Sequence, residues 1–128
     1  MGSIKKLVSG QNESGTSAVE LALVMPILIM ILFGIFQFGL AFNNYLAITH
    51  AAREGARMAA VGSYSQSAVI QDALPAVPSS VTLTYPDGQQ QGNPVTVTVT
   101  ENYLLDIPFF GARTIPLTSS GTMRQEAP

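Results

Sequence analysis

Residues 21–42 read LALVMPILIMILFGIFQFGLAF, an almost unbroken apolar run that decides how the rest of the chain is organised. Twenty-two helical residues span about 33 Å, which is enough to cross a hydrocarbon core of about 30 Å. No Asp, Glu, Lys or Arg lies between Glu20 and Arg53. A helix that is apolar on all sides must be buried in lipid or in other protein, so the run predicts a membrane-spanning helix.

A removable secretory signal is the alternative interpretation of this run, but the apolar region of such a signal typically has only about 7–15 residues. The small-x-small tripeptide at residues 39–41 resembles a cleavage site, yet the helical pattern continues straight through it. We therefore expect a retained anchor in membrane lipid. Lys5 and Lys6 precede the run, and positive charge favours the cytoplasmic side, so the chain is expected to be single-pass with its C-terminal part exported.

The long N-terminal helix is expected to cover residues 16–62, with residues 21–42 in the membrane. Residues 1–15 form a polar, partly basic leader that we expect to be disordered. Pro26 removes one backbone donor and predicts a kink inside the helix. Gly62 is placed to adopt the left-handed conformation that commonly ends a helix.

The periodicity changes after the helix, and residues 63–128 are expected to form a small exported domain. Residues 65–74 are predicted to form a short helix. Apolar residues then alternate with threonine over residues 81–85 and 95–100, a period-two pattern typical of β-strands around a turn. A third strand is predicted over residues 113–124. The fold class is therefore predicted as α+β, a long transmembrane helix followed by a short helix and a three-stranded antiparallel sheet.

The last third of the chain adds two further expectations. Ile115, Leu117 and Met123 are expected to face inward, and Pro116 predicts that their strand lies at an edge or a bulge. Residues 103–111 are unusually apolar for a connection between strands. They either fold back over the sheet or the helix, or form an exposed contact patch for a partner subunit or the membrane surface.

A short motif, GTSAVE at residues 15–20, precedes the apolar run. Glycine before a bond lets an extended strand enter a peptidase cleft, because it has no side chain to clash. Cleavage after Gly15 would leave Thr16 as the new N-terminus and Glu20 as the fifth residue of the mature chain. Ser17 and Glu20 also form a capping box, so helix capping alone is a second explanation for the acidic residue.

This arrangement resembles the type IV prepilin processing site. Residues 51–57, AAREGAR, resemble the segment that follows the hydrophobic helix in TadE-like proteins. A proline early in the apolar run and the Phe-Gly pairs at 33–34 and 38–39 match the same layout. TadE-like proteins are pseudopilins, or minor pilins, of the tight-adherence (Tad/Flp) system, and the resemblance extends over residues 15–60.

The resemblance implies cleavage by a prepilin peptidase and a place in the bacterial cytoplasmic membrane or in a surface pilus. It implies partners among other pilin or pseudopilin subunits and the Tad assembly machinery. For Glu20 it implies pairing with the amine of Thr16 on a neighbouring subunit, which would offset the cost of a carboxylate in lipid. A membrane-anchored binding or adhesin module unrelated to pili is the alternative function.

Small residues recur every four positions beyond the apolar run, at Ala47, Ala51, Gly55 and Ala59. Small side chains at this spacing let helices approach closely. The stripe therefore predicts packing either between subunits or against the chain's own sheet. Arg53 and Arg57 lie in the same segment, and Glu54 can reach Arg57 at i,i+3. These charges are assigned either to the packing segment or to a solvated or headgroup-level face.

Composition argues against several other classes of function. Only 11% of the residues are charged and the net charge is −2, which does not favour a nucleic-acid partner held through phosphates. The chain has no cysteine, and its single histidine, His50, lies in an alanine-rich helical stretch. No nucleophile–base pair and no phosphate-binding glycine loop is evident. We expect a non-enzymatic protein with no catalytic residues, cofactor, metal or small-molecule substrate.

Overall fold

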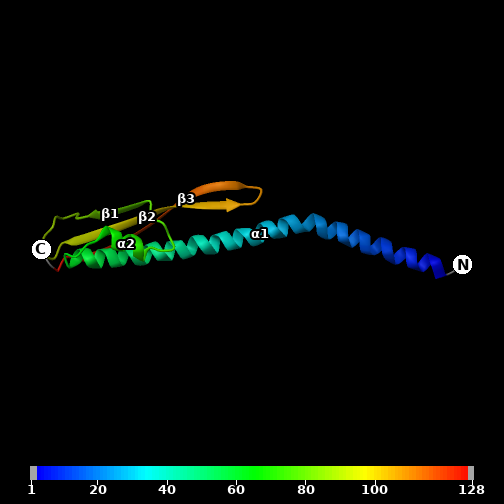
Figure 1. The fold of residues 1–128 in the computed structure, drawn as a ribbon, viewed down its shortest axis with the longest axis horizontal. Helices are drawn as coiled ribbons and strands as arrows, with labels where there is room; N and C mark the ends of the chain where they lie inside the picture. The colour runs from blue at the N-terminus through cyan, green and yellow to red at the C-terminus, as the bar shows by residue number, and fades with distance from the viewer. Residues whose placement is uncertain (1–2, 127–128) are drawn as a thin grey trace.

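The computed structural model describes the backbone of residues 3–126 and the side chains of residues 14–126. One long helix carries a small unit at its C-terminal end, in which a second helix and a sheet lie against the long helix (Figure 1). The elements are α1 (Ser3–Ala60), α2 (Gln66–Asp72), β1 (Ser80–Thr84), β2 (Pro94–Ile107) and β3 (Gly111–Arg124). This confirms the predicted α+β fold.

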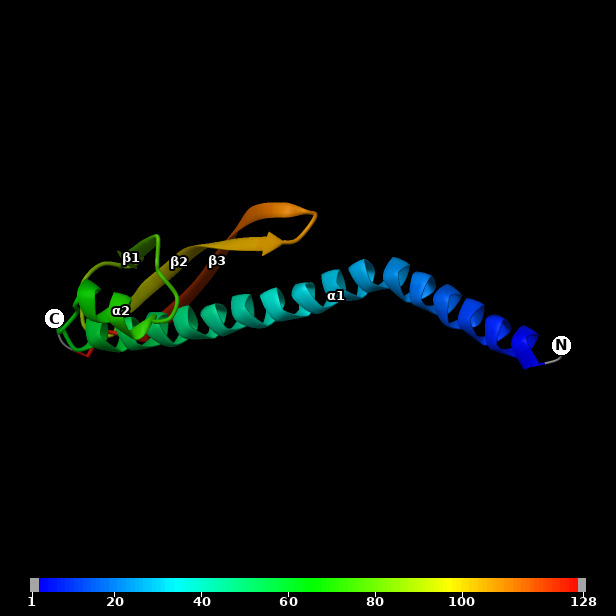
Figure 2. The same cartoon turned by 45° about the vertical axis from the view of Figure 1, so that its right-hand side comes forward.

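Helix α1 begins at Ser3, well before the predicted start at residue 16. Adding residues to an existing helix needs no new nucleus, so a polar stretch without proline can simply prolong it. Ser17 consequently lies inside α1 and is not its N-cap in the uncleaved chain. Pro26 lies within the helix, and α1 bends in its N-terminal half (Figure 2).

The C-terminal end of α1 follows the prediction for Gly62. Gly62 has a positive φ of 75°. Its N–H donates to the carbonyl of Ala59 at 3.2 Å, and the N–H of Ser63 donates to the carbonyl of Met58 at 2.9 Å. These two bonds form a Schellman motif, which satisfies carbonyls that would otherwise lack partners at the helix end. Helix α2 then begins after Ser65, whose hydroxyl accepts from the N–H of Ala68.

The sheet is antiparallel with strand order β1-β2-β3. β2 continues to Ile107, and only three residues separate it from β3. Residues 103–111 are therefore mostly strand and a tight turn, and the prediction of a connection there is wrong. The period-two pattern simply persists, because Glu101, Tyr103 and Leu105 are in phase with the valines before them and share their face of the sheet.

The long hairpin of β2 and β3 lies along α1 and forms the core with it. Ile48, Val69, Val95, Val97 and Val99 are the largest side chains that are completely buried. β3 is an edge strand, which explains how it accommodates Pro116 opposite Asn102.

The inward-facing residues predicted for β3 have different environments. Ile115 and Leu117 are partly buried. Met123 pairs with the buried Val95, but its position at the sheet edge leaves it 40% exposed. The prediction of an inward Met123 is therefore correct for its side of the sheet and wrong for its burial.

Candidate functional site

The N-terminal half of α1 presents large apolar side chains to its surroundings. Within Ser14–Ala60, α1 is long and apolar enough to cross a membrane, and none of its most apolar window is buried. Phe36, Phe38 and Phe42 are 61%, 69% and 63% exposed. Leu32, Phe33 and Phe36 line an apolar hollow of about 250 Å³ on this part of the helix. Since the chain itself covers little of this surface, its natural partner is lipid or another protein.

One stripe of α1 is the exception, because the hairpin lies over it. Its members recur every three or four residues and are at least partly shielded: Gln37, Ala41, Asn44, Ile48, Ala51, Gly55 and Ala59. The stripe begins inside the apolar run, so the hairpin extends beside residues that the sequence assigned to the membrane.

Gln37 ties the far end of the hairpin to the helix. Its Nε2 donates to the backbone carbonyl of Asp106 at 2.9 Å, and the hydroxyl of Tyr103 donates to its Oε1 at 3.3 Å. Both ends of this amide are therefore engaged by β2. A polar side chain in the middle of an apolar run is explained by these partners, which lie more than 60 residues further along the chain.

Glu101 makes a second polar contact between β2 and α1. Its side chain is only 5% exposed. Oε1 accepts from Nδ2 of Asn44 at 3.0 Å and from the backbone N–H of Val77 at 3.1 Å. Oε2 is buried without a hydrogen-bond partner in the structure. The carboxylate thus joins the helix, the sheet and the connector after α2.

The small residues of α1 allow the sheet to approach very closely. A Cβ added to Gly55 would lie 2.8 Å from Cγ2 of Val69 and 3.1 Å from Cγ1 of Val97. A Cβ added to Gly121 on β3 would lie 2.6 Å from the carbonyl oxygen of Ala52. Ala51 and Ala59 are buried and Ala47 is partly buried. Packing within the chain, against its own sheet, therefore explains the small residues that recur every four positions in this part of α1.

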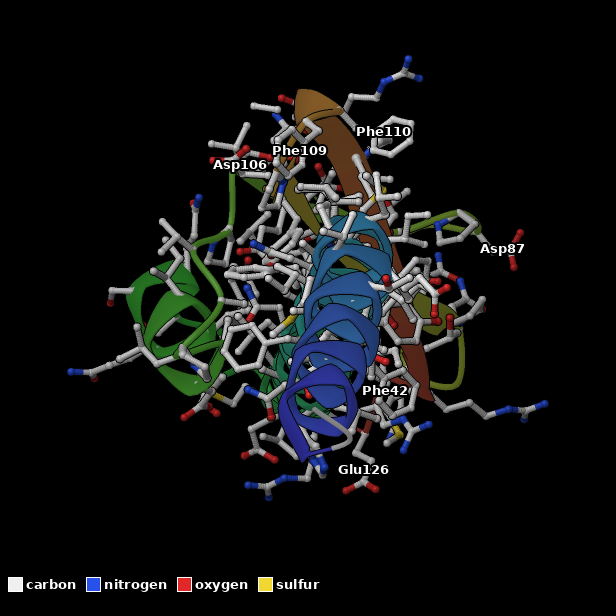
Figure 3. The ribbon with its side chains drawn as sticks, turned by 90° about the vertical axis from the view of Figure 1, so that its right-hand side faces the viewer. Phe42, Asp87, Asp106, Phe109, Phe110 and Glu126 are labelled. Atoms are coloured by element: carbon white, nitrogen blue, oxygen red, sulfur yellow. The ribbon has the colours of Figure 1, made fainter. Side chains whose placement is uncertain are left out.

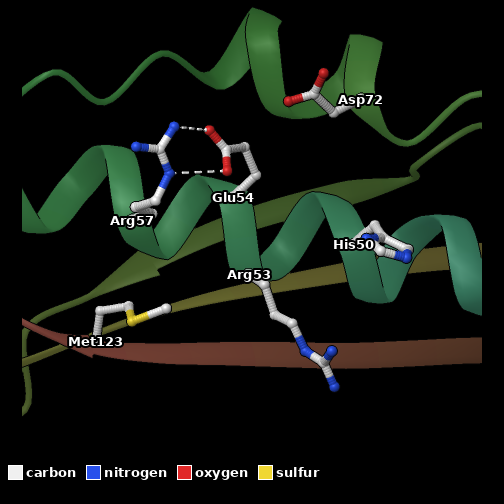
Figure 4. Close-up of a pocket in the computed structure, with 6 residues that line it drawn as sticks. All are labelled: His50, Arg53, Glu54, Arg57, Asp72 and Met123. Atoms are coloured by element: carbon white, nitrogen blue, oxygen red, sulfur yellow. Dashed lines mark hydrogen bonds and ion pairs between the residues drawn. The ribbon is translucent and has the colours of Figure 1, made fainter.

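Charged residues cluster on the outer side of the same segment. His50, Arg53, Glu54, Arg57, Asp72 and Met123 line an open hollow of about 480 Å³ (Figure 4). Glu54 and Arg57 form an ion pair at i,i+3, as predicted. The hydrogen bond from Arg57 lowers the pKa of the Glu54 carboxyl, and the same bond raises the pKa of Arg57. Arg53 points away from this pair and is exposed, so these charges form a solvated face.

The residues of the processing motif lie far from the sheet. Gly15, Thr16 and Glu20 are exposed on α1, and a Cβ added to Gly15 would meet nothing within 4 Å. Thr16 and Glu20 are four positions apart and share one side of the helix. Lys5 and Lys6, on which the predicted orientation rests, lie outside the part of the chain whose side chains are described.

His50 is exposed on α1, as expected of a polar residue on a helix surface. Among the residues that the structure describes, no three His, Asp or Glu side chains gather in a group that could hold a metal ion.

These features define a class of protein: a single long apolar helix, suited to a membrane, that carries a small α+β unit at its C-terminal end. Residues 15–57, which include the processing motif and the AAREGAR segment, match the family model described as TadE-like protein. The match confirms the resemblance over about a third of the chain and indicates a protein associated with a Tad-type pilus. Comparison with curated proteins and with solved structures gives no match.

Sequence reasoning did not identify Gln37 or Glu101 as features of this site, whereas it gave an exposed contact patch as one of two interpretations of residues 103–111, which include the end of the hairpin. A signal for Glu101 was present, because it continues the alternation of Val95, Val97 and Val99. That phase places a carboxylate on the buried face of β2, where it needs a partner. For Gln37 the only signal was a single amide within an apolar run.

Proposed function

We propose that this protein is a pseudopilin, or minor pilin, of a Tad-type pilus or secretion apparatus, with a structural and not a catalytic role. The observation that carries the proposal is the coincidence of the TadE-like match with the exposed apolar part of α1. The helix anchors the subunit in the bacterial cytoplasmic membrane, N-terminus inward, and later contacts other pilin subunits. The small domain is displayed outside the cytoplasm.

Maturation is proposed to occur by prepilin peptidase cleavage between Gly15 and Thr16. Both residues lie within α1, so the helix must open locally before the bond can enter a peptidase. Gly10 and Gly15 favour this opening, because each costs a helix about 1 kcal/mol relative to alanine. The exposed position of Gly15 leaves the bond accessible from the side.

Assembly is proposed to use Glu20. Cleavage would create a cationic amine at Thr16, four residues and about 6 Å along the helix axis from Glu20. A neighbouring subunit displaced by that amount would bring its amine level with this carboxylate. Such a pair offsets the desolvation of both charges and sets the axial stagger, whereas either charge alone in lipid would be costly.

The N-terminal residue of the protein recovered from membranes tests the proposal. In cells with the prepilin peptidase we expect a mature chain beginning at Thr16. Gly15→Leu should abolish cleavage, whereas Gly10→Leu, in the same leader, should leave it unchanged. A chain that keeps Met1 or Gly2 while it functions normally would favour a membrane-anchored binding or adhesin module instead.

Glu20→Gln separates assembly from helix capping. The amide retains most of the hydrogen-bonding capacity of a capping box but removes the charge. We expect a processed, membrane-inserted subunit that is no longer recovered with its partner subunits. Undiminished co-purification of the Gln variant would show that the charge has no part in assembly.

A further inference from the structure

The end of the β2–β3 hairpin has an unusual composition for a solvent-exposed turn. Phe109 and Phe110 are 82% and 71% exposed. The N–H of Phe110 donates to the carbonyl of Ile107 at 3.1 Å, with Pro108 and Phe109 between them. Phe109 has a positive φ of 71°, a conformation that glycine or asparagine ordinarily occupies at this position of a turn. A bulky aromatic residue in this place indicates a surface kept for contact.

The position of the hairpin along α1 is set by Gln37. The carbonyl of Asp106 accepts from Gln37, and Phe109 follows three residues later. β2 runs antiparallel to α1, since Glu101 contacts Asn44 and Asp106 contacts Gln37. At about 3.3 Å per strand residue, the turn therefore extends up to about 10 Å beyond Gln37, toward the N-terminus of the helix. Figure 3, viewed from that end, shows Phe109 and Phe110 at the end of the hairpin beside α1.

This geometry restricts where a bilayer surface can lie. If residues 21–42 were all in hydrocarbon, Gln37 would lie about 7 Å below the surface. The exposed charges Asp106 and Arg113, together with the open edge of β3, would then be immersed in lipid, which is strongly unfavourable. A hydrocarbon segment of about 20 residues that ends near Phe36 avoids this conflict and begins near Ser17. Residues 37–42 then lie at the headgroup level.

The geometry points to insertion of the Phe109–Phe110 turn into the outer lipid interface beside α1, so that helix and hairpin hold the subunit at two points. The inference rests on the proposed membrane anchoring by α1. The turn lies level with apolar residues of the helix that are proposed to face the same bilayer. Asp106 and Arg113 then lie among the headgroups, as is typical of segments that lie in a membrane interface.

Tryptophan fluorescence in vesicles tests this inference directly, because the chain has no tryptophan of its own. The full chain would be reconstituted in phosphatidylcholine–phosphatidylglycerol vesicles whose acyl chains carry bromine, a quencher, near the headgroups. Three single variants are compared: Phe110→Trp at the turn, Phe33→Trp on the anchor, and Val61→Trp directly after the C-terminal end of α1. Val61 lies about 36 Å along the helix from Gln37 and serves as the control outside the bilayer.

We expect brominated lipid to quench Phe110→Trp and Phe33→Trp to a similar extent and to leave Val61→Trp unaffected. Quenching of Phe33→Trp alone would overturn the insertion of the turn and leave the anchor intact. Loss of quenching at both positions would overturn the anchor as well. A blue-shifted, unquenched Phe110→Trp whose emission depends on the protein-to-lipid ratio would assign the turn to a second copy of the chain, against the inference.

Discussion

The two halves of α1 use opposite kinds of side chain for opposite kinds of contact. Between residues 47 and 60 the helix is rich in Ala and Gly, and these small residues are buried against the sheet. Between residues 21 and 42 it is rich in Leu, Ile and Phe, and most of these large residues are exposed. Along α1 the large apolar residues are therefore mostly exposed, whereas the small residues are mostly buried.

This difference teaches that the two halves have different partners. Small residues let a β-sheet approach the helix backbone, and the interface gains its energy from close packing. Burying one large apolar side chain contributes about 1.5–3 kcal/mol of free energy. The large apolar residues that the chain leaves uncovered would forgo this contribution if they stayed in water. The exposed half is consistent with a partner outside the chain, and the packed half carries the domain.

The strongest test of the packed half is Gly121→Ala. The added Cβ would lie within 2.8 Å of three backbone atoms of Ala52 and Arg53, and backbone atoms cannot move aside as a side chain end can. We expect a loss of about 3 kcal/mol in the free energy of unfolding of the domain. The measurement is denaturant unfolding of the full chain in detergent, followed by circular dichroism.

Gly34→Ala is the matched control in the other half of the helix, where an added Cβ meets nothing within 4 Å. It should be neutral or stabilise the helix by up to about 1 kcal/mol. Equal effects of the two substitutions would contradict the division of α1 into a packed and an uncovered half.

The second test concerns the buried carboxylate that joins the sheet to the packed half. Glu101→Ala removes the acceptor for Asn44 and for the N–H of Val77, and each unsatisfied buried donor costs about 1–3 kcal/mol. We expect a loss of about 2 kcal/mol in unfolding free energy. Glu101→Gln keeps one carbonyl acceptor in the same place and should cost much less. A Gln variant as unstable as the Ala variant would show that the charge, and not the acceptor, is needed.

The third test concerns the turn beside the uncovered half. Phe109→Gly should stabilise the hairpin by about 1 kcal/mol, because glycine adopts a positive φ without steric strain. Phe110→Gly removes a neighbouring ring without this conformational benefit and is the control. Thermal unfolding of both variants in detergent provides the comparison. If Phe109→Gly is no more stable than Phe110→Gly, the backbone at residue 109 is not strained.

The smallest effect is expected at the solvated face of the packed half. The hydrogen bond from Arg57 lowers the pKa of Glu54 below its ordinary value of 4.5, so the pair stabilises the native state above that pH. The contribution fades as the pH falls through the lowered pKa. Both groups are well exposed, so Glu54→Gln should lower the melting temperature only slightly at pH 7 and not at all at pH 2. A larger loss at low pH would contradict this assignment.

Much of the architecture was predictable from local pattern. The apolar run predicted the long helix, Gly62 predicted its end, and the two runs that alternate apolar residues with threonine predicted the antiparallel pairing of β1 with β2. Predictions that needed an element boundary were less accurate. Helix α1 begins earlier and strand β2 ends later than predicted. A helix or a strand continues through polar residues once its neighbours hold it in place.

The sequence by itself determined that the chain has one long apolar helix, a small α+β domain and a TadE-like segment. Local periodicity and charge are enough for that, since they act over a few residues. Only the tertiary structure decided that the hairpin extends beside the apolar run and that Gln37 and Glu101 find their partners there. Those contacts join residues more than 50 positions apart, and a local pattern carries no information about which distant groups will meet.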